Sequence, residues 1–245
     1  MEVALVRAAN PSPLTLSGTN TWIVGRSPAW IVDPGPALES HTAAVAAAVE
    51  AAGGAGGIVL THDHADHVEG VDALRGRLGS PPVGAMRHPA DVRLGDGDEI
   101  GPFTALHLPG HAPDHLVFVA EDVAFTGDAV LGEGSVFVAP GGGGLGAYLD
   151  GLRRLRALGL ARLHPGHGPV VEDPAAHLDG YIAHRLDRER RLVEALTGGV
   201  RGEEALLDAA WADAPPALRR IAALSLRAHL DKLRDEDRLP DDVQA

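Results

Sequence analysis

Residues 58–67 read IVLTHDHADH, and this stretch decides the fold. Its first three residues are apolar and strand-like and a helix-favouring segment follows it, so the histidines stand where a strand gives way to a helix. α/β enzymes place reactive side chains at such junctions. His62 and His64, two apart on an extended backbone, point to the same side, and Asp66 and His67 at the helix start face a neighbouring point. The stretch therefore offers ligand pairs for two adjacent metal ions.

Three later turns offer further ligands. Each follows an apolar run and contains glycine, with proline in two of them, which turns the backbone sharply and lets a side chain project from the rim of a sheet. The chain has no cysteine, so imidazole and carboxylate groups must provide the coordination. The turns supply these candidates: His111 in PGH (109–111), Asp128 in GD (127–128) and His167 in PGHG (165–168).

The order and spacing of these seven side chains resemble the metallo-β-lactamase superfamily of two-metal hydrolases. The resemblance covers roughly the first 175 residues and rests on ligand positions in four separate motifs. It implies an α+β fold, a four-layer αββα sandwich. It also implies how the ligands divide: His62, His64 and His111 on a first metal ion, Asp66, His67 and His167 on a second, and Asp128 as a bridge.

Two segments and the tail narrow the resemblance. Residues 10–13 (NPSP), residues 18–22 (GTNTW) and a helical tail resemble the branch of mitochondrial β-lactamase-like endoribonucleases and their bacterial relatives. Members of this branch carry a C-terminal winged-helix-like domain, and they often have Tyr where this chain has Trp22. The resemblance implies a catalytic domain over residues 1–175 and a small all-α, winged-helix-like domain over residues 176–245.

The spacing of apolar residues agrees with this division. Past residue 174 only helical patterns remain, enough for three helices. A wing would have to come from residues 238–245, which are few and include two adjacent aspartates. No ligand candidate follows His167, so we expect the tail to be independent of the metal centre. Before the tail, apolar periodicity predicts strands over residues 3–6, 21–24, 29–32, 116–119 and 123–125, and helices over 41–52, 68–78 and 148–158.

Two side chains are expected beside the metal ligands. Asp33 ends the strand 29–32, and the resemblance makes it a second-shell residue that orients a ligand; on the residues alone, an aspartate that caps a turn is an equal alternative. His115 follows His111 by four residues and recurs in the superfamily pattern, which implies a structural place in the second shell. For the histidines without a motif, packed or solvent-facing imidazole is the expectation: His41, His88, His107, His164, His177, His184 and His229.

Charge and composition bound the partners. The 245-residue chain has a formal net charge of −13; residues 1–180 carry 21 acidic and 10 basic side chains, and residues 181–245 carry 13 and 11. Nucleic-acid binding rests on Lys and Arg, so a small-molecule substrate is favoured over single-stranded RNA.

No apolar span of about twenty residues and no targeting pattern is present, which indicates a cytoplasmic protein with no membrane partner. One lysine against twenty arginines suggests a GC-rich bacterial genome. The oligomeric state stays open, with a homodimer among the options.

The expected chemistry is hydrolysis by a hydroxide bridging two zinc ions, with iron or manganese as alternatives for the same ligand types. Asp66 is the expected catalytic residue, because it can orient the hydroxide and accept its proton. The chain has no Gly-x-Ser-x-Gly nucleophile motif. A small ester or thioester is the favoured substrate, as in glyoxalase II. Zinc β-lactamases of the superfamily use Cys or His and no bridging Asp, which disfavours antibiotic hydrolysis.

Three alternatives stay open. The branch resemblance favours a single-strand-specific endoribonuclease. Iron at the same ligands would allow a redox reaction, as in the persulfide dioxygenases of the superfamily. A non-catalytic regulatory protein would require a vestigial metal centre, and no ligand is missing, so this alternative is the least favoured.

Overall fold

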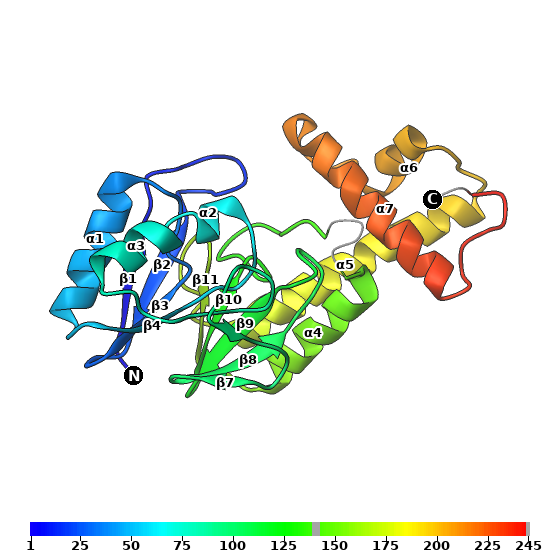
Figure 1. The fold of residues 1–245 in the computed structure, drawn as a ribbon. Coiled ribbons are helices and arrows are strands. Elements are labelled where there is room, and N and C mark those ends of the chain that lie inside the picture. The colour runs from blue at the N-terminus through cyan, green and yellow to red at the C-terminus, as the bar shows by residue number, and fades with distance from the viewer. Residues whose placement is uncertain (139–142, 244–245) are drawn as a thin grey trace. The chain divides into compact units, whose positions relative to one another are not determined.

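The computed structural model describes residues 1–138 and 143–243. The chain forms two compact units, whose elements are labelled in Figure 1. The first unit consists of Met1–Leu108, Asp114–Val136 and Gly159–Pro174. The second unit consists of Pro109–Pro113, Phe137–Leu158 and Ala175–Ala245.

The first unit contains two β-sheets. The first sheet has the order β1-β2-β3-β4-β5-β6, antiparallel from β1 to β3 and parallel from β3 to β6. The second has the order β11-β10-β9-β8-β7, in which β10 and β11 run parallel and the other neighbours antiparallel. The strands are β1 Val3–Arg7, β2 Asn20–Val24, β3 Ala29–Val32, β4 Ala55–Val59, β5 Val83–Ala85, β6 Val92–Arg93, β7 Glu99–Ile100, β8 Phe103–His107, β9 Leu116–Ala120, β10 Val123–Gly127 and β11 Arg162–Pro165.

Alternating apolar residues bury both faces of the first sheet, because adjacent side chains on a strand point to opposite faces. One core lies between the two sheets and includes Trp22, Val32, Val59, Phe103, Phe118 and Phe125. The other core lies between the first sheet and the helices α1 (Glu39–Ala51) and α3 (Val71–Arg77), and it includes Ile23, Ile31, Ile58, Val45, Val49 and Leu74. In Figure 1 these two helices lie together beside the first sheet. The first unit thus contains one helical layer, formed by α1 and α3, and two β-sheet layers.

The helix expected over residues 68–78 is interrupted. The structure has a short α2, Ala65–Val68, and then α3, which begins at Val71. Gly70 carries the break: its N–H donates to the carbonyl oxygen of Gly35 at 2.9 Å. A Cβ at Gly70 would lie 2.8 Å from the carbonyl oxygen of Pro34. A close approach between two turns therefore ends the helical run that the apolar spacing predicts, and only glycine allows it.

The second unit is helical in its described residues. Leucines of α5, α6 and α7 form its core together with Trp211. The described residues of the tail, 175–243, contain no strand, so the wing expected from residues 238–245 is absent as far as residue 243. No helix in the described parts of the chain is both long and apolar enough to cross a membrane. The helices are α4 Leu145–Ala157, α5 Pro174–Thr197, α6 Glu203–Ala210, the 3-10 turn η1 Pro216–Leu218, and α7 Arg219–Asp235.

The second unit includes more than the residues after 174. Helix α4 and the loop Pro109–Pro113 group with the tail helices. The reason is packing: α4 lies against α7, and Tyr148 of α4 touches the backbone of Gly110. The tail is therefore continuous with helix α4 rather than a separate appendage.

Candidate metal centre

The ends of two parallel strands position the histidine-rich loop. Asp33 follows β3, Thr61 follows β4, and these strands pair in parallel, so their carboxyl ends meet at one edge. The Thr61 N–H donates to Asp33 Oδ1 at 2.8 Å, and its hydroxyl donates to Asp33 Oδ2 at 2.7 Å. The same hydroxyl lies 3.0 Å from Nδ1 of His62. Asp33 thus anchors the first residues of the loop.

Asp33 also holds His67, which is fully buried. Nδ1 of His67 lies 2.8 Å from Asp33 Oδ2. The opposite ring nitrogen, Nε2, is buried without a hydrogen bond of its own and lies 3.5 Å from carboxylate oxygens of Asp66 and Asp128. A carboxylate on one imidazole nitrogen, with the other aimed at a cluster of ligand atoms, is the arrangement found at protein metal sites.

The second sheet delivers Asp128 and His167 to the same cluster. Asp128 follows β10 and His167 follows β11, and these strands pair in parallel. Nε2 of His167 lies 3.3 Å from Asp66 Oδ2 and 3.3 Å from Asp128 Oδ1. Two imidazole nitrogens and two carboxylate oxygens, from three segments distant in sequence, therefore converge on one point.

Strand β2 fastens the turn that carries His167. The Asn20 side-chain amide donates to the carbonyl oxygens of Pro165 at 3.0 Å and Gly168 at 2.9 Å. The indole N–H of Trp22 donates to the same Pro165 oxygen at 3.0 Å. These buried bonds fix the turn between two different sheets.

Thr19 reaches the cluster directly. Its hydroxyl donates to Asp66 Oδ2 at 2.9 Å. The Thr19 N–H donates in turn to the side-chain oxygen of Asn10, also at 2.9 Å. The segments 10–13 and 18–22, which carried the branch resemblance, therefore orient a predicted metal ligand.

Gly166 leaves room for the cluster. A Cβ at this position would lie 2.7 Å from Asp128 Oδ1 and 2.7 Å from Cε1 of His67. Its N–H donates to the carbonyl oxygen of Gly127 at 2.9 Å, which keeps the two turns in contact. Any side chain at Gly166 would push into the predicted ligands.

The other predicted residues of the first unit continue the cluster. Nε2 of His62 lies 2.9 Å from Nδ1 of His64. The His62 ring stacks on His115 at a centroid distance of 4.8 Å, and His115 Nε2 accepts the backbone N–H of Asp128 at 3.1 Å. His115 therefore supports both a ligand ring and the turn of the predicted bridge. Asp114 accepts the N–H of Asp63 at 3.1 Å and holds the loop between His62 and His64.

His111 lies in the loop Pro109–Pro113 and belongs to the second unit. Its Nδ1 lies 3.4 Å from the carbonyl oxygen of Phe137, and its ring meets the Phe137 ring edge-on at 5.1 Å. Of the seven predicted ligands, six are thus gathered within the first unit, and His111 is positioned by the second.

The cluster balances acidic and basic groups. Burial alone would raise the pKa of Asp66, but the hydrogen bond with His167 and the charge of His67 lower it to about 2. Burial would lower the pKa of His167, yet its hydrogen bonds with Asp128 and Asp66 raise it to about 9. Burial opposes the charge of His67 as well, but Asp128 and Asp33 raise its pKa well above the ordinary value. The pKa of Asp128 is held well below its usual range: its burial is outweighed by the charge of His67. Carboxylates that attract protons onto two imidazoles would equally attract cations.

The donor set fits divalent metal ions. Ligand atoms of His62, His67 and Asp128 lie within 4.8 Å of one another, and so do those of Asp66, His67 and His167. Imidazole nitrogens and carboxylate oxygens suit zinc, iron and manganese. Two overlapping groups that share His67 are consistent with more than one ion.

Several supporting residues escaped the sequence prediction: Thr61, Thr19, Asn20 and Asp114 act through hydrogen bonds to ligands or their loops. The sequence could have pointed to Thr61 and Asp114 only through their position next to predicted site residues. Their hydrogen-bond partners lie far away in the sequence. In contrast, His164 behaves as the packed imidazole that was expected. It stacks on Phe125 at 5.0 Å, and burial lowers its pKa to about 4.

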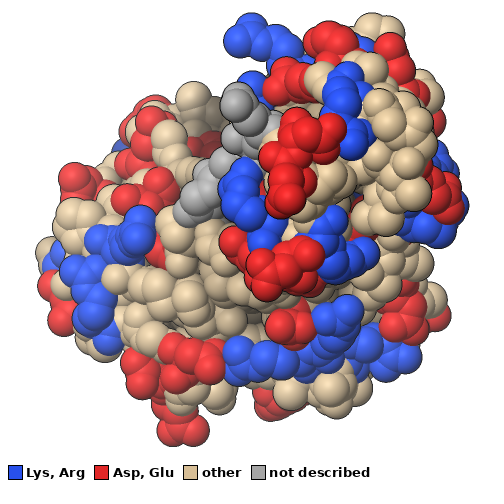
Figure 2. Space-filling model, turned by 90° about the vertical axis from the view of Figure 1, so that its right-hand side faces the viewer, with Lys and Arg blue, Asp and Glu red and all other residues tan. Residues whose placement is uncertain are grey.

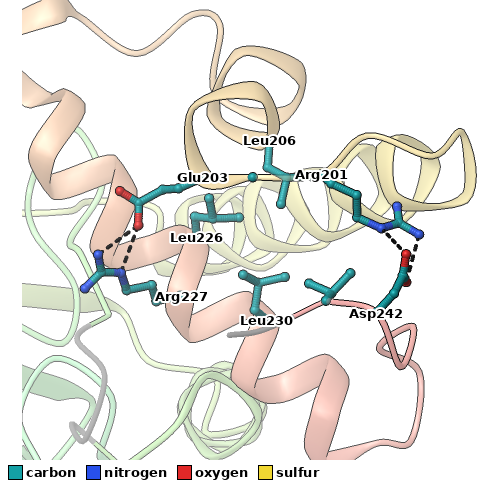
Figure 3. Close-up of a pocket in the computed structure, with 9 residues that line it drawn as sticks. Arg201, Glu203, Leu206, Leu226, Arg227, Leu230 and Asp242 are labelled. Atoms are coloured by element: carbon teal, nitrogen blue, oxygen red, sulfur yellow. Dashed lines mark hydrogen bonds and ion pairs between the residues drawn. The ribbon is translucent and has the colours of Figure 1, made fainter.

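The cavity drawn in Figure 3 contains none of the predicted ligands. It lies in the second unit, between α6, α7 and the C-terminal segment, has a volume of about 570 Å³, and is lined in part by Leu206, Leu226 and Leu230. Its charged side chains pair with one another: Arg227 with Glu203 at 2.8 Å and Arg201 with Asp242 at 2.9 Å. The candidate chemistry therefore lies in the histidine and aspartate cluster.

Comparisons with known proteins show which family the chain resembles. The family model described as metallo-beta-lactamase superfamily matches residues 81–167. A beta-lactamase-like protein 2 homologue of Caenorhabditis elegans is 32% identical, over 94% of this chain and 83% of its own length. An atrochrysone carboxyl ACP thioesterase of a Cryptosporiopsis species is 31% identical, over 79% of this chain and 62% of its own.

A solved structure shares the fold. A metallo-beta-lactamase family protein from Thermus thermophilus aligns with a TM-score of 0.70 and 23% identity, over 96% of this chain and 94% of that one. The α+β class with two sheets and a helical C-terminal region is therefore confirmed. With a relative of 32% identity aligned over most of both chains, this chain belongs to the metallo-beta-lactamase superfamily.

Proposed function

We propose that the chain is a hydrolase that uses two divalent metal ions, zinc in the first instance, to cleave a small ester or thioester. The proposed ligands are those that the sequence indicated. They are His62, His64 and His111 for one ion, Asp66, His67 and His167 for the other, and Asp128 shared between them.

One observation carries the proposal. Nε2 of His67 and Nε2 of His167 each lie within 3.5 Å of carboxylate oxygens of both Asp66 and Asp128. His67 and His167 are 0% and 1% exposed. Four ligand-type atoms that converge in a buried site would suit a cation, which could bind all four in place of the protons on the two imidazoles.

Divalent ions bound there would lower the pKa of water and polarise an acyl carbonyl. The protein supplies the proton acceptor: with a pKa of about 2, Asp66 is a carboxylate at neutral pH. Thr19 donates to Asp66 Oδ2 and so orients the carboxylate. With an ion bound, Asp33 would keep the proton on Nδ1 of His67 and leave Nε2 to the ion as a lone-pair donor.

The charge distribution supports a small substrate. Residues 1–180 carry a large acidic excess, as counted above. On the face seen in Figure 2, acidic side chains lie among the basic ones. A long polyanion would gain little from such a surface. The thioesterase among the relatives supports an acyl group as the target.

Single-stranded RNA is the second candidate. The resemblance of residues 10–13 and 18–22 to the endoribonuclease branch is what favours it. Beta-lactamase-like protein 2 homologues of two animals align over 94% and 97% of this chain, so the likeness to these proteins is not confined to the first unit. The acidic excess opposes it, as does the absence of a wing in residues 175–243.

The test combines metal analysis with a substrate panel. The purified protein is assayed for bound zinc, iron and manganese, and then for turnover of aryl esters, thioesters, lactones and unstructured RNA. We expect two metal ions per chain and acyl hydrolysis that is lost in His62→Ala but kept in His177→Ala, a histidine on α5 outside the cluster. Cleavage of RNA at physiological salt with no acyl turnover would reverse the order of the two candidates.

A further inference from the structure

Helix α4 touches the loop that carries His111. Gly110 has φ +145°, and a Cβ there would lie 2.6 Å from Cβ and from Cδ2 of Tyr148. The backbone immediately before His111 therefore rests on the Tyr148 ring. Gly110 is the residue that allows this approach, because any side chain would collide with the ring.

Tyr148 is itself fixed from the other side. It is fully buried, and Cζ of Arg185 on α5 lies 5.9 Å from its ring centroid. Arg185 is also hydrogen-bonded to the Tyr148 side chain and is 3% exposed. The Arg185 carbonyl oxygen lies 3.3 Å from Nε2 of His229 on α7. A buried guanidinium tolerates little movement of its partners, since each lost bond leaves a charge unsatisfied.

The loop is held at its other flanks within the same unit. His111 contacts the carbonyl oxygen and ring of Phe137, as described above. Gly143 approaches Pro109 so closely that a Cβ on the glycine would collide with Cβ of the proline. The segment Pro109–Pro113 therefore packs against Tyr148 of α4, Gly143 just before α4, and Phe137.

We infer that Tyr148 is a positioning residue for His111, and that Arg185 extends this support into the helical tail. The part that concerns metal binding rests on the proposed function, in which His111 is a ligand. Metal ligands must be held within about 0.5 Å by their supporting residues, and a five-residue turn with glycine and two prolines has little rigidity of its own. The tail thus contributes to the metal centre without supplying a ligand.

The loop can be tested without any metal. Hydrogen exchange of the peptide covering residues 106–116 is measured on metal-free protein for Tyr148→Leu and for Leu152→Ala, which removes an equally buried side chain one turn further along α4. We expect exchange in this peptide to accelerate about tenfold or more in Tyr148→Leu and to stay unchanged in Leu152→Ala. Equal protection in both variants would overturn the inference.

Two more variants guard against simple unfolding. Tyr148→Phe keeps the ring and should restore most of the protection of the loop. Gly110→Ala perturbs the same contact from the loop side, without changing a helix, and should loosen the peptide as Tyr148→Leu does. If Gly110→Ala leaves exchange as in the unaltered protein, the contact does not hold the loop.

The metal readout separates the inference from the proposed function. Zinc affinities are measured by competition with a chelator for Tyr148→Leu and His111→Ala. We expect both variants to weaken one of two sites tenfold or more and to leave the other in place. If His111→Ala keeps two tight sites, the proposed ligand set is wrong and the metal part of the inference falls with it. If His111→Ala loses a site and Tyr148→Leu does not, the ligand set stands and the positioning role is refuted.

Discussion

Asp33 Oδ2 lies 2.8 Å from Nδ1 of His67, at the junction of two parallel strands. The same carboxylate accepts both the N–H and the hydroxyl of Thr61. One buried side chain therefore fixes the entry of the histidine-rich loop and the tautomer of a proposed ligand in its middle. Because Asp33 contacts both the loop backbone and a proposed ligand, a substitution at Asp33 tests the proposed site.

Replacing Asp33 with Asn should weaken metal binding. The amide presents at most one acceptor oxygen to three donors, so the orientation of His67 loosens. Losing a carboxylate that holds a metal-binding histidine costs about 10–100-fold in metal affinity, and we expect a loss of this size for the ion proposed at His67. Chelator competition measures it, with Asp208→Asn, an exposed aspartate of α6, as the control. Unchanged affinities in both variants would show that Asp33 serves only the backbone.

Replacing Asp128 with Ala should remove one metal ion and most of the activity. The carboxylate oxygen lies near both His67 and His167, and two cations would repel each other without it. Elemental analysis of the variant should give about one ion per chain. Two ions per chain together with full activity would contradict the bridging role.

The metal-free protein should lose stability as pH rises above neutral. His167 has a folded pKa of about 9 against an ordinary 6.5, so its contribution is complete below about 6.5 and is lost as pH rises through 9. Asp66 has a folded pKa of about 2 against 3.8, so its contribution is complete above 3.8 and is lost as pH falls through 2. The free energy of unfolding in urea, with metal removed, should therefore decline between about pH 6.5 and 9. His167→Gln should flatten this decline. A decline of unchanged slope in that variant would show that His167 does not cause it.

Gly166→Ala should reduce the affinity for metal ions. The added methyl group would press on Asp128 and His67 at 2.7 Å, and overpacking of this kind costs about 1–3 kcal/mol. Gly76→Ala on α3 is the matched control, because a Cβ there meets nothing within 4 Å. We expect chelator competition to show weakened binding in the first variant only. Equal metal affinity in the two would mean that the turn shifts without disturbing the ligands.

A chain that ends at Pro174 should not keep an intact centre, which reverses the expectation from the sequence that the tail is independent of the metal site. Although no predicted ligand lies beyond His167, truncation removes Arg185 from Tyr148 and α7 from α4. We expect the shortened protein to be poorly soluble or to hold fewer metal ions than the full chain. A soluble, truncated protein with two tightly bound ions would show that the tail is dispensable.

The candidate ligands could be picked out because they sit in short motifs at strand ends. His62, His64, Asp66 and His67 are adjacent in sequence, and glycine or proline marks the later turns. The apolar run 21–24 likewise predicted a strand, which the structure has as β2 (Asn20–Val24). Local chemistry was sufficient for these features.

The features that the sequence did not predict depend on contacts between residues that are distant in sequence. Nothing near Gly70 in sequence reveals the carbonyl oxygens of Pro34 and Gly35, which end the helix there. Tyr148 packs against Gly110 in the structure. The sequence pattern assigns Tyr148 to a helix and Gly110 to a turn, and it does not indicate that the two residues are in contact. Spacing describes which face of an element is apolar, but it does not say what that face packs against.

The bonds from Asn20 to Pro165 and Gly168 span 145 and 148 residues. Loops of this length close late, because the chain loses conformational entropy long before such contacts stabilise it. The turn that carries His167 can settle only after β2 and β11 have both found their sheets. Metal uptake should therefore follow the assembly of the first unit rather than nucleate it, and a bound ion would mark a chain that has completed its folding.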